Sequence, residues 1–225
     1  MQKQIKAIFN KISTQYSHTN LCAGIKCINN NLDKLAQKMA KIGISANMIS
    51  VCGFILGMFA VNLLANNMFT LALFFILLNR LCDTLDGKIA KIKGKTEFGV
   101  FIDACLDYVF YAAVIFGFAL ANSTNNALSA AFLLFAFAAS ACAMLAYAVV
   151  DYAKGIKNEN VLKESPFYLG GMAQGAETTI AFIVLCLVPQ WFVPIAIILG
   201  CWCLAKFLLV VSSAYYNFVI ATKRK

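Results

Sequence analysis

Four aspartates lie close together in an otherwise apolar part of the chain. Asp83 and Asp86 are three residues apart, and Asp103 and Asp107 are four residues apart. On helices, each spacing places both carboxylates of a pair on one face. Carboxylates this close repel one another, and near lipid they also lose their hydration. A hard divalent cation relieves both costs, and oxygen-only ligands favour Mg²⁺, Mn²⁺ or Ca²⁺ over zinc. The pattern therefore predicts a divalent-metal site.

Small residues beside the aspartates indicate what this site would receive. Mg²⁺ usually binds a few carboxylates and completes its shell with water and substrate phosphate. Gly87, Ala90 and Gly99 leave bare backbone against which a flat nucleotide could lie. Four lysines in the same stretch can balance phosphate charge, namely Lys88, Lys91, Lys93 and Lys95. We therefore expect a phosphate-bearing substrate at the metal site.

The elements that carry these residues are predicted to be membrane helices. The chain has 225 residues, of which 61% are hydrophobic and 13% are charged, and its mean hydropathy is +0.76. This composition exceeds the apolar content of soluble domains, and apolar runs of about 20 residues span a bilayer. We predict an all-α polytopic membrane protein with six transmembrane helices at 47–65, 70–87, 98–120, 128–150, 171–188 and 192–217.

The positive charges follow the predicted topology. The net charge of +9 could suggest nucleic acid, but the lysines and arginines outside the spans gather on alternate connections and at both ends. They lie within 3–41, 88–95, 154–163 and 223–225, whereas the connections 65–70, 121–127 and 188–191 carry none. This is the positive-inside pattern. It predicts an integral membrane protein, of the inner membrane in a bacterium, with both termini and the aspartates on the cytoplasmic side and no nucleic-acid partner.

The segment before the first span contains an amphipathic pattern. From Asn30 to Lys41, apolar residues recur at helical spacing and lysines occupy the other face. This pattern is typical of a helix lying on the cytoplasmic leaflet, although an ordinary solvated helix would show it too. We predict a cytoplasmic N-terminal segment at 1–45 with a juxtamembrane amphipathic helix, followed by one membrane domain at 46–220.

Two stretches of the sequence resemble the CDP-alcohol phosphotransferase family. The aspartates form the string D-x2-D-G-x2-A-K-x7-G-x3-D-x3-D, which is similar to the family signature except that Lys91 replaces an arginine. Lysine keeps the charge and loses the bidentate fork of arginine. The stretch SANMISVCGFILG (45–57) resembles the family's P-N-x-x-[TS]-x-x-G segment, with Ala46 in place of proline.

The resemblance implies an enzyme that moves a phosphatidyl-type group from a CDP-linked lipid, such as CDP-diacylglycerol, to a small alcohol and releases CMP. It implies two Mg²⁺ or Mn²⁺ ions, a bilayer environment and a homodimer. By this resemblance the metal ligands are Asp83, Asp86 and Asp103, and Asp107 is a further ligand, the general base, or both. The implied CDP-binding residues are Asn47, Ser50, Gly87, Ala90, Lys91 and Gly99.

Other polar residues within or between the spans carry open alternatives. Arg80 either orients Asp83, contacts phosphate, or reaches the interface. Glu177 and Lys206 form either a structural ion pair or part of a pocket, and Lys206 could instead pair with the aspartates. The connection 151–171 contains lysines suited to a phosphorylated acceptor alcohol, although the positive-inside rule also explains them.

Two other functions fit parts of the sequence. A divalent-cation transporter could use the same acids, but transport sites usually lie at the midplane between related halves, and no second half repeats these aspartates. A scaffold of the same fold that has lost its activity would be consistent with the lysine at 91.

Overall fold

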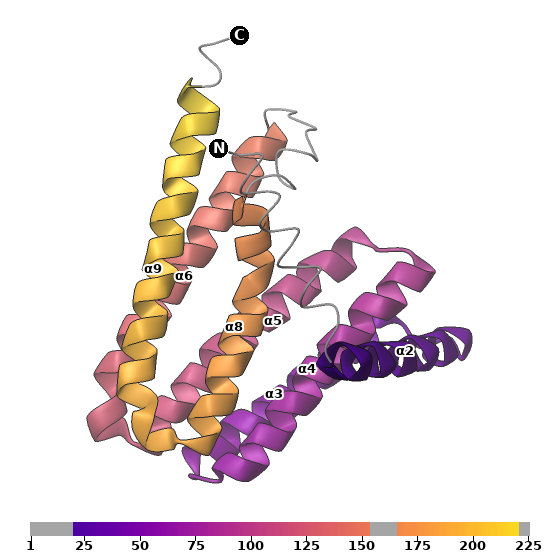
Figure 1. Ribbon diagram of the computed structural model, residues 1–225, viewed down its shortest axis with the longest axis horizontal. Helices are drawn as coiled ribbons and strands as arrows, with labels where there is room; N and C mark the ends of the chain where they lie inside the picture. The colour runs from indigo at the N-terminus through magenta and orange to yellow at the C-terminus, as the bar shows by residue number, and fades with distance from the viewer. Residues whose placement is uncertain (1–19, 154–165, 221–225) are drawn as a thin grey trace. The chain divides into compact units, whose positions relative to one another are not determined.

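The computed structural model describes residues 20–153 and 166–220, and this part of the chain is helical with no strand (Figure 1). The predicted all-α class is therefore confirmed. The long helices are α2 (Asn20–Lys41), α3 (Ala46–Ala65), α4 (Phe69–Lys93), α5 (Glu97–Ala121), α6 (Ser123–Ala153), α8 (Pro166–Leu187) and α9 (Phe192–Tyr215). A 3₁₀ turn, η2 (Pro189–Trp191), precedes α9, and a π turn, η3 (Tyr216–Ile220), follows it.

Four stretches of the described residues are long and apolar enough to cross a membrane. They are Ala46–Ala65, Glu97–Ala121, Ser123–Val150 and Pro189–Val219. The helices at the other two predicted spans, α4 and α8, are not among these four stretches. α4 carries two aspartates and three lysines in its second half, and the apolar stretch Glu177–Leu187 of α8 is by itself too short to cross a membrane. The protein is a membrane protein, and its described residues include four candidate spans.

The helices divide into two compact units. One contains Met1–Gly53 and Arg80–Leu106, and the other contains Phe54–Asn79 and Asp107–Lys225. The helices α3, α4 and α5 each contribute one end to the first unit and the other end to the second. Each unit is described by itself below. Residues 1–19 of the predicted N-terminal segment lie outside the described residues.

In the first unit, α2 packs against α4 and the start of α3. Ala36, Leu85 and Ile89 form a small buried core, joined by Leu32, Met39, Ala46 and Ile49. An ion pair adds to this packing, because Lys88 Nζ lies 2.5 Å from Asp33 Oδ1. The predicted amphipathic helix at 30–41 is thus the second half of a longer helix, and most of its apolar stripe contacts protein.

In the first unit, local hydrogen bonds in the connections cap the ends of the helices. After α2, Gly43 has φ +97°, and Ile44 N donates to Met39 O at 3.1 Å, which is a Schellman motif. Ser45 Oγ then accepts from Met48 N at 3.3 Å and caps α3. After α4, Gly94 has φ +94°, and Thr96 Oγ1 caps α5 by accepting from Gly99 N at 3.0 Å. These motifs fix where α3 and α5 begin.

In the second unit, aromatic side chains fill the core between close helices. Phe110, Phe118, Phe182 and Phe192 are almost fully buried. A Cβ added at Gly57 would lie 2.6 Å from Phe110 Cδ2, so glycine lets α3 and α5 approach closely. α6 packs along α9 in this unit (Figure 1). Many large apolar side chains remain exposed, as expected for helices that face lipid.

An ion pair joins α8 to α9. Lys206 Nζ contacts Glu177 Oε2, and Trp202 Nε1 donates to the same oxygen at 2.9 Å. Lys206 Nζ also lies 5.6 Å from the centre of the Trp202 ring, within range of a cation–π contact. Of the two partners considered for Lys206, the structure shows Glu177. The prediction of an ion pair between these residues is confirmed.

This pair predicts a stability effect that depends on both partners. Glu177→Gln should leave a cation without its partner and lower the free energy of unfolding by about 1–3 kcal/mol, less than for a fully buried pair. Lys206→Met should destabilise similarly, and the double variant should lose less than the sum. Thermal unfolding in detergent measures all three. Additive losses would show that the two side chains act independently.

Candidate active site

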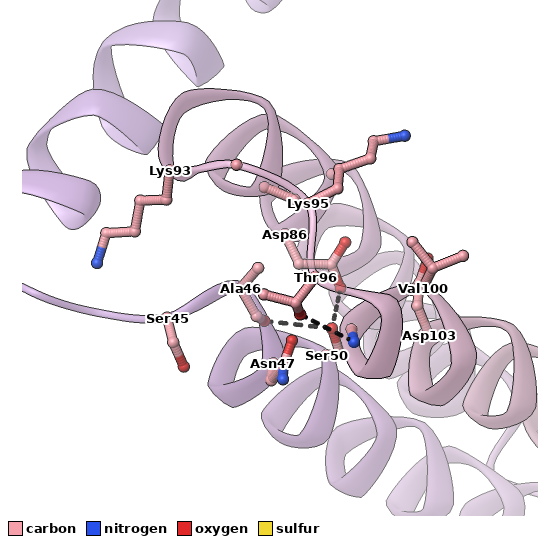
Figure 2. Close-up of a pocket in the computed structure, with 14 residues that line it drawn as sticks. Ser45, Ala46, Asn47, Ser50, Asp86, Lys93, Lys95, Thr96, Val100 and Asp103 are labelled. Carbon is pink, nitrogen blue, oxygen red and sulfur yellow. Dashed lines mark hydrogen bonds between the residues drawn. The ribbon is translucent and has the colours of Figure 1, made fainter.

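A cavity in the first unit lies at the start of α3, the end of α4 and the start of α5. Its volume is about 310 Å³. Five of the six residues implied to bind CDP line it: Asn47, Ser50, Gly87, Ala90 and Gly99. Figure 2 labels two of them, Asn47 and Ser50, beside Asp86 and Asp103. Lys91 is exposed and is not among the lining residues. Residues from two segments far apart in the sequence therefore meet at one cavity.

The two glycines of the cavity serve different purposes. A Cβ added at Gly87 would meet nothing within 4 Å, so the backbone of α4 is bare and open at this position. A Cβ added at Gly99 would lie 2.8 Å from Thr96 Oγ1 and 2.9 Å from Asn47 Oδ1. Gly99 thus allows the start of α5 to approach α3, whereas Gly87 leaves room for a ligand.

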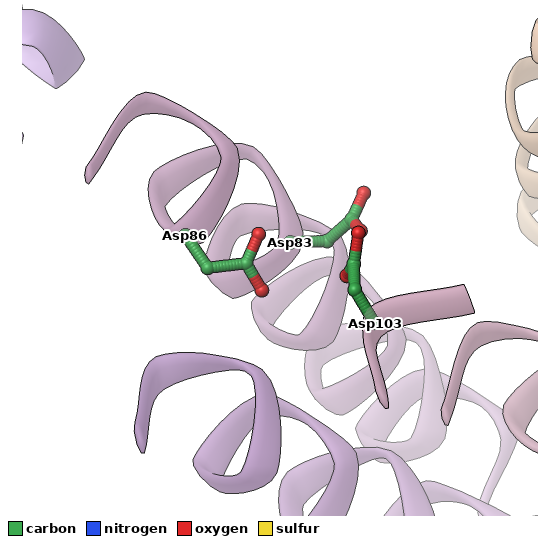
Figure 3. A group of neighbouring side chains, drawn as sticks. All are labelled: Asp83, Asp86 and Asp103. Atoms are coloured by element: carbon green, nitrogen blue, oxygen red, sulfur yellow. The ribbon is translucent and has the colours of Figure 1, made fainter. Parts of the chain in front are cut away.

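Three aspartates gather at the same place. Asp83 and Asp86 project from α4 and Asp103 from α5, and one carboxylate oxygen of each lies within 4.8 Å of the other two (Figure 3). The short link from Lys93 to Glu97 places the end of α4 beside the start of α5. Asp107 lies one helical turn beyond Asp103 on α5 and is not a member of this group. The predicted gathering is therefore seen for three aspartates.

Neighbouring side chains hold two of these carboxylates. Asp86 is only 4% exposed, and Ser50 Oγ donates to Asp86 Oδ2 at 2.6 Å. Arg80 Nη1 lies 3.6 Å from Asp83 Oδ2, which supports the prediction that Arg80 orients this aspartate. One arginine and one hydroxyl offset only part of the repulsion among three carboxylates. The oxygen-only set and its spacing fit a hard divalent cation.

The lysines expected to balance phosphate have different neighbours. Lys93 and Lys95 line the cavity, and Lys93 Nζ also donates to Ile44 O at 2.8 Å. Lys88 pairs with Asp33 of α2, so it fastens α2 to α4. Lys93 and Lys95 are therefore the lysines that the structure places at the cavity.

Sequence reasoning missed two hydroxyl-bearing residues at the cavity. Ser45 and Thr96 both line it, and each caps the helix that follows. A hydroxyl residue just before an apolar helical stretch was the available signal. Because the caps lie at the cavity, the N-termini of α3 and α5 border it, and such termini favour negative charge. The segment 154–165, which includes the lysines expected to bind the acceptor, lies outside the described residues.

The all-helical membrane fold and the acidic residues beside the cavity are consistent with a membrane enzyme that acts on phosphate esters. The chain belongs to the CDP-alcohol phosphatidyltransferase family, whose sequence profile matches residues 43–202. The members are enzymes that use CDP-alcohol substrates and divalent metal ions. The resemblance to this family is thereby confirmed.

Two relatives agree with this assignment. The chain is 40% identical over 173 residues to the inner membrane protein YnjF of Escherichia coli (strain K12), covering 76% of this chain and 84% of YnjF. It is 32% identical over 95 residues to archaetidylinositol phosphate synthase of Pyrococcus horikoshii, covering 40% of this chain and 48% of the synthase. No solved structure gives a significant match.

The aspartate group predicts a measurable metal affinity. Asp86→Asn and Asp103→Asn should each weaken Mn²⁺ binding by about 100-fold or more, because even loss of an outer-shell contact costs about 10–100-fold. The free Mn²⁺ signal in electron paramagnetic resonance reports the bound fraction. Glu97→Gln, an exposed acid at the start of α5, is the matched control and should bind as the parent does. Equal affinity in all variants would remove the aspartates from the metal site.

Proposed function

We propose that this enzyme transfers a phosphatidyl-type group from a CDP-linked lipid, CDP-diacylglycerol, to a small alcohol and releases CMP. The observation that carries the proposal is the meeting of the aspartates with the cavity. Asp86 and Asp103 belong to the metal-competent group and also line the cavity that contains the residues implied to bind CDP. A diphosphate held in this cavity would therefore lie beside carboxylates able to hold its metal ions.

The cavity suggests how the nucleotide is oriented. The bare backbone at Gly87 and Ala90 would receive the flat cytosine ring, and Asn47 offers an amide that both donates and accepts hydrogen bonds. The diphosphate would lie toward Lys95 and the aspartates, where the N-terminus of α5 also favours negative charge. Lys91 would act from the rim, because it does not line the cavity.

The aspartates have separate tasks in this proposal. Asp83, Asp86 and Asp103 would hold two Mg²⁺ or Mn²⁺ ions, and Ser50 would fix the orientation of Asp86 through its hydrogen bond. When bound, such ions clamp the diphosphate and neutralise charge that develops on the leaving group. Arg80 would keep Asp83 turned toward the group.

Asp107 would act on the acceptor. It follows Asp103 by one turn of α5, so the two lie on one face of the helix. As general base it would take the proton of the attacking hydroxyl, whose oxygen forms a bond to the lipid-side phosphorus. The bond from that phosphorus to the oxygen of CMP breaks, and CMP leaves with the electron pair. A role as a further metal ligand is compatible with this task.

Several acceptors fit the proposal. Glycerol 3-phosphate, inositol phosphate and serine are small alcohols, and each has at least one hydroxyl group from which a base could take the proton. The name of the Pyrococcus relative states that it makes archaetidylinositol phosphate, which is the reason to test inositol phosphate first. A phosphorylated acceptor would also suit the lysines of 154–163.

We also propose the full membrane arrangement for the domain at 46–220. α4 and α8 contain 25 and 22 residues, which correspond to about 38 and 33 Å of helix and suffice for a core of about 30 Å. With these two, six spans cross the bilayer. The distribution of positive charges favours an orientation in which both termini and the active site face the cytoplasm. In the segment 1–45, the exposed Leu35 and Ile42 would let α2 lie on the lipid surface. A homodimer remains a prediction from the family.

The activity is tested by CMP release. Purified protein is incubated with CDP-diacylglycerol, Mn²⁺ and each alcohol in turn, and we expect CMP to appear with one alcohol and to require the metal. Asp107→Asn should lower kcat by about 10²–10⁴-fold, the usual contribution of a general base. Unchanged Mn²⁺ affinity in this variant would assign Asp107 to proton transfer, and weakened affinity would make it a ligand as well.

Other results would favour other functions. Metal uptake into protein-containing vesicles, without CMP release from any alcohol, would favour a divalent-cation transporter. Neither activity, with Mn²⁺ still bound, would favour a scaffold.

The open face at Gly87 predicts a defect limited to substrate binding. Gly87→Ala should fold normally, because the new methyl group meets no atom and alanine favours the helix by about 1 kcal/mol. The methyl group should nevertheless occupy nucleotide space and raise KM for the CDP-lipid several-fold. In contrast, Gly99→Ala should also lower the melting temperature, because its methyl group collides with Thr96 and Asn47. An unchanged KM in Gly87→Ala would mean that the nucleotide lies elsewhere.

A further inference from the structure

A second cavity lies in the second unit and has a different chemical character. Its volume is about 570 Å³, and the links between α3 and α4, between α5 and α6, and between α8 and α9 all contribute to it. Five of its lining residues carry side-chain amides: Asn67, Asn122, Asn125, Asn126 and Gln190. This volume is within the range of small-molecule sites, which is about 300–1,000 Å³.

The second cavity is distinct from the candidate active site. Its residues Phe69 and Phe118 lie at the start of α4 and near the end of α5. The aspartates lie toward the other end of each of these helices. The two cavities share no lining residue.

The lining residues define the kind of ligand that could bind. None of them carries a charge, so the cavity offers no counterion to a phosphate, a carboxylate or an amine. Each amide presents two N–H donors and a carbonyl acceptor, which matches a hydroxyl group that both donates and accepts. Phe69 and Phe118 form an apolar wall, stacked with ring centres 6.0 Å apart. Neutral amides beside an apolar wall suit a neutral molecule with several hydroxyl groups.

Part of the wall is held in place before any ligand arrives. Asn126 is 8% exposed, and its Nδ2 donates to Phe118 O at 2.8 Å. Asn67 has φ 60° and ends α3 in a Schellman motif, with Asn67 N donating to Leu64 O at 2.9 Å. Thr124 Oγ1 donates to Asn122 Oδ1 at 3.0 Å. A site whose polar groups are fixed in advance pays less ordering entropy on binding.

We propose that this cavity binds the hydroxyl-rich part of a neutral polyol, either a free sugar or the sugar headgroup of a lipid. Asn125 and Gln190 are exposed at the cavity and make the adjustable contacts, while the buried Asn126 and the hydrogen-bonded Asn122 form the more fixed part of the wall. With the proposed orientation, the cavity lies among the connections that carry no lysine or arginine, and these connections would face away from the cytoplasm. The ligand would therefore be distinct from both substrates of the transfer reaction.

Saturation-transfer NMR on the full chain tests this proposal. The protein is purified in a detergent without sugar groups, and maltose is the free probe. We expect saturable transfer to maltose in the millimolar range. Asn125→Ala combined with Gln190→Ala should weaken binding about tenfold or more, because two hydrogen-bonding groups are lost. Asn66→Ala is the matched control, since Asn66 is exposed in the same turn as Asn67 but does not line the cavity.

A second arm distinguishes a free sugar from a lipid headgroup. The protein is placed in nanodiscs of phosphatidylcholine with or without a neutral diglucosyl lipid, and the emission of Trp191, next to Gln190, is recorded. Trp202→Phe removes the other tryptophan. A change with the glycolipid that exceeds the change with maltose identifies a headgroup, and the reverse identifies a free sugar.

The tests of the polyol site are independent of the test of the transferase activity. CMP release should be unchanged in the Asn125→Ala, Gln190→Ala double variant, and its melting temperature should match that of the parent. No saturable response to either probe would overturn the polyol site. A response that survives in the double variant would also overturn it, because the ligand would then bind elsewhere.

Discussion

The first unit depends on keeping three carboxylates close together in a partly buried place. Asp86 is almost inaccessible, and its carboxylate oxygen lies within 4.8 Å of those of Asp83 and Asp103. This arrangement is unfavourable by itself, so the surrounding contacts must hold it. The Ser50 hydroxyl and the Arg80 guanidinium contribute directly. The packing of Leu85 and Ile89 against α2 contributes indirectly, because these residues alternate with the aspartates around α4.

The same constraint explains the composition of the cavity. Glycine at position 99 lets α5 approach α3, and the caps at Ser45 and Thr96 determine where both helices begin. Each of these features brings backbone N–H groups and small side chains near the carboxylates. A negatively charged diphosphate could enter such a place only when cations accompany it, since the aspartates would otherwise repel it. In the proposed function, the acids and the helix termini would therefore make substrate binding depend on metal binding.

Much of the site could be predicted because most of its residues lie within one short stretch of the sequence. The spacing within 83–107 places the acids on helix faces, and it predicted the meeting of Asp83, Asp86 and Asp103. The contact between Ser50 and Asp86 joins residues 36 positions apart, so only the family resemblance pointed to Ser50. Lys88 was expected near phosphate, but its partner Asp33 comes from a helix whose position depends on tertiary packing. The amide-lined cavity was missed because asparagines in short links are also typical turn residues, and their convergence requires the fold.

The packing of α2 has a consequence for the smallest piece of this protein that could work alone. The match to the family begins at residue 43, whereas α2 ends at Lys41 and thus lies before the shared region. Nevertheless Ala36 and Asp33 of α2 contact the same part of α4 that carries its acids, through Leu85, Ile89 and Lys88. A chain shortened to the start of the family match would keep every signature residue but lose the contacts between α2 and α4. The packing of α2 therefore predicts that a working fragment of this protein must include residues before the start of the family match.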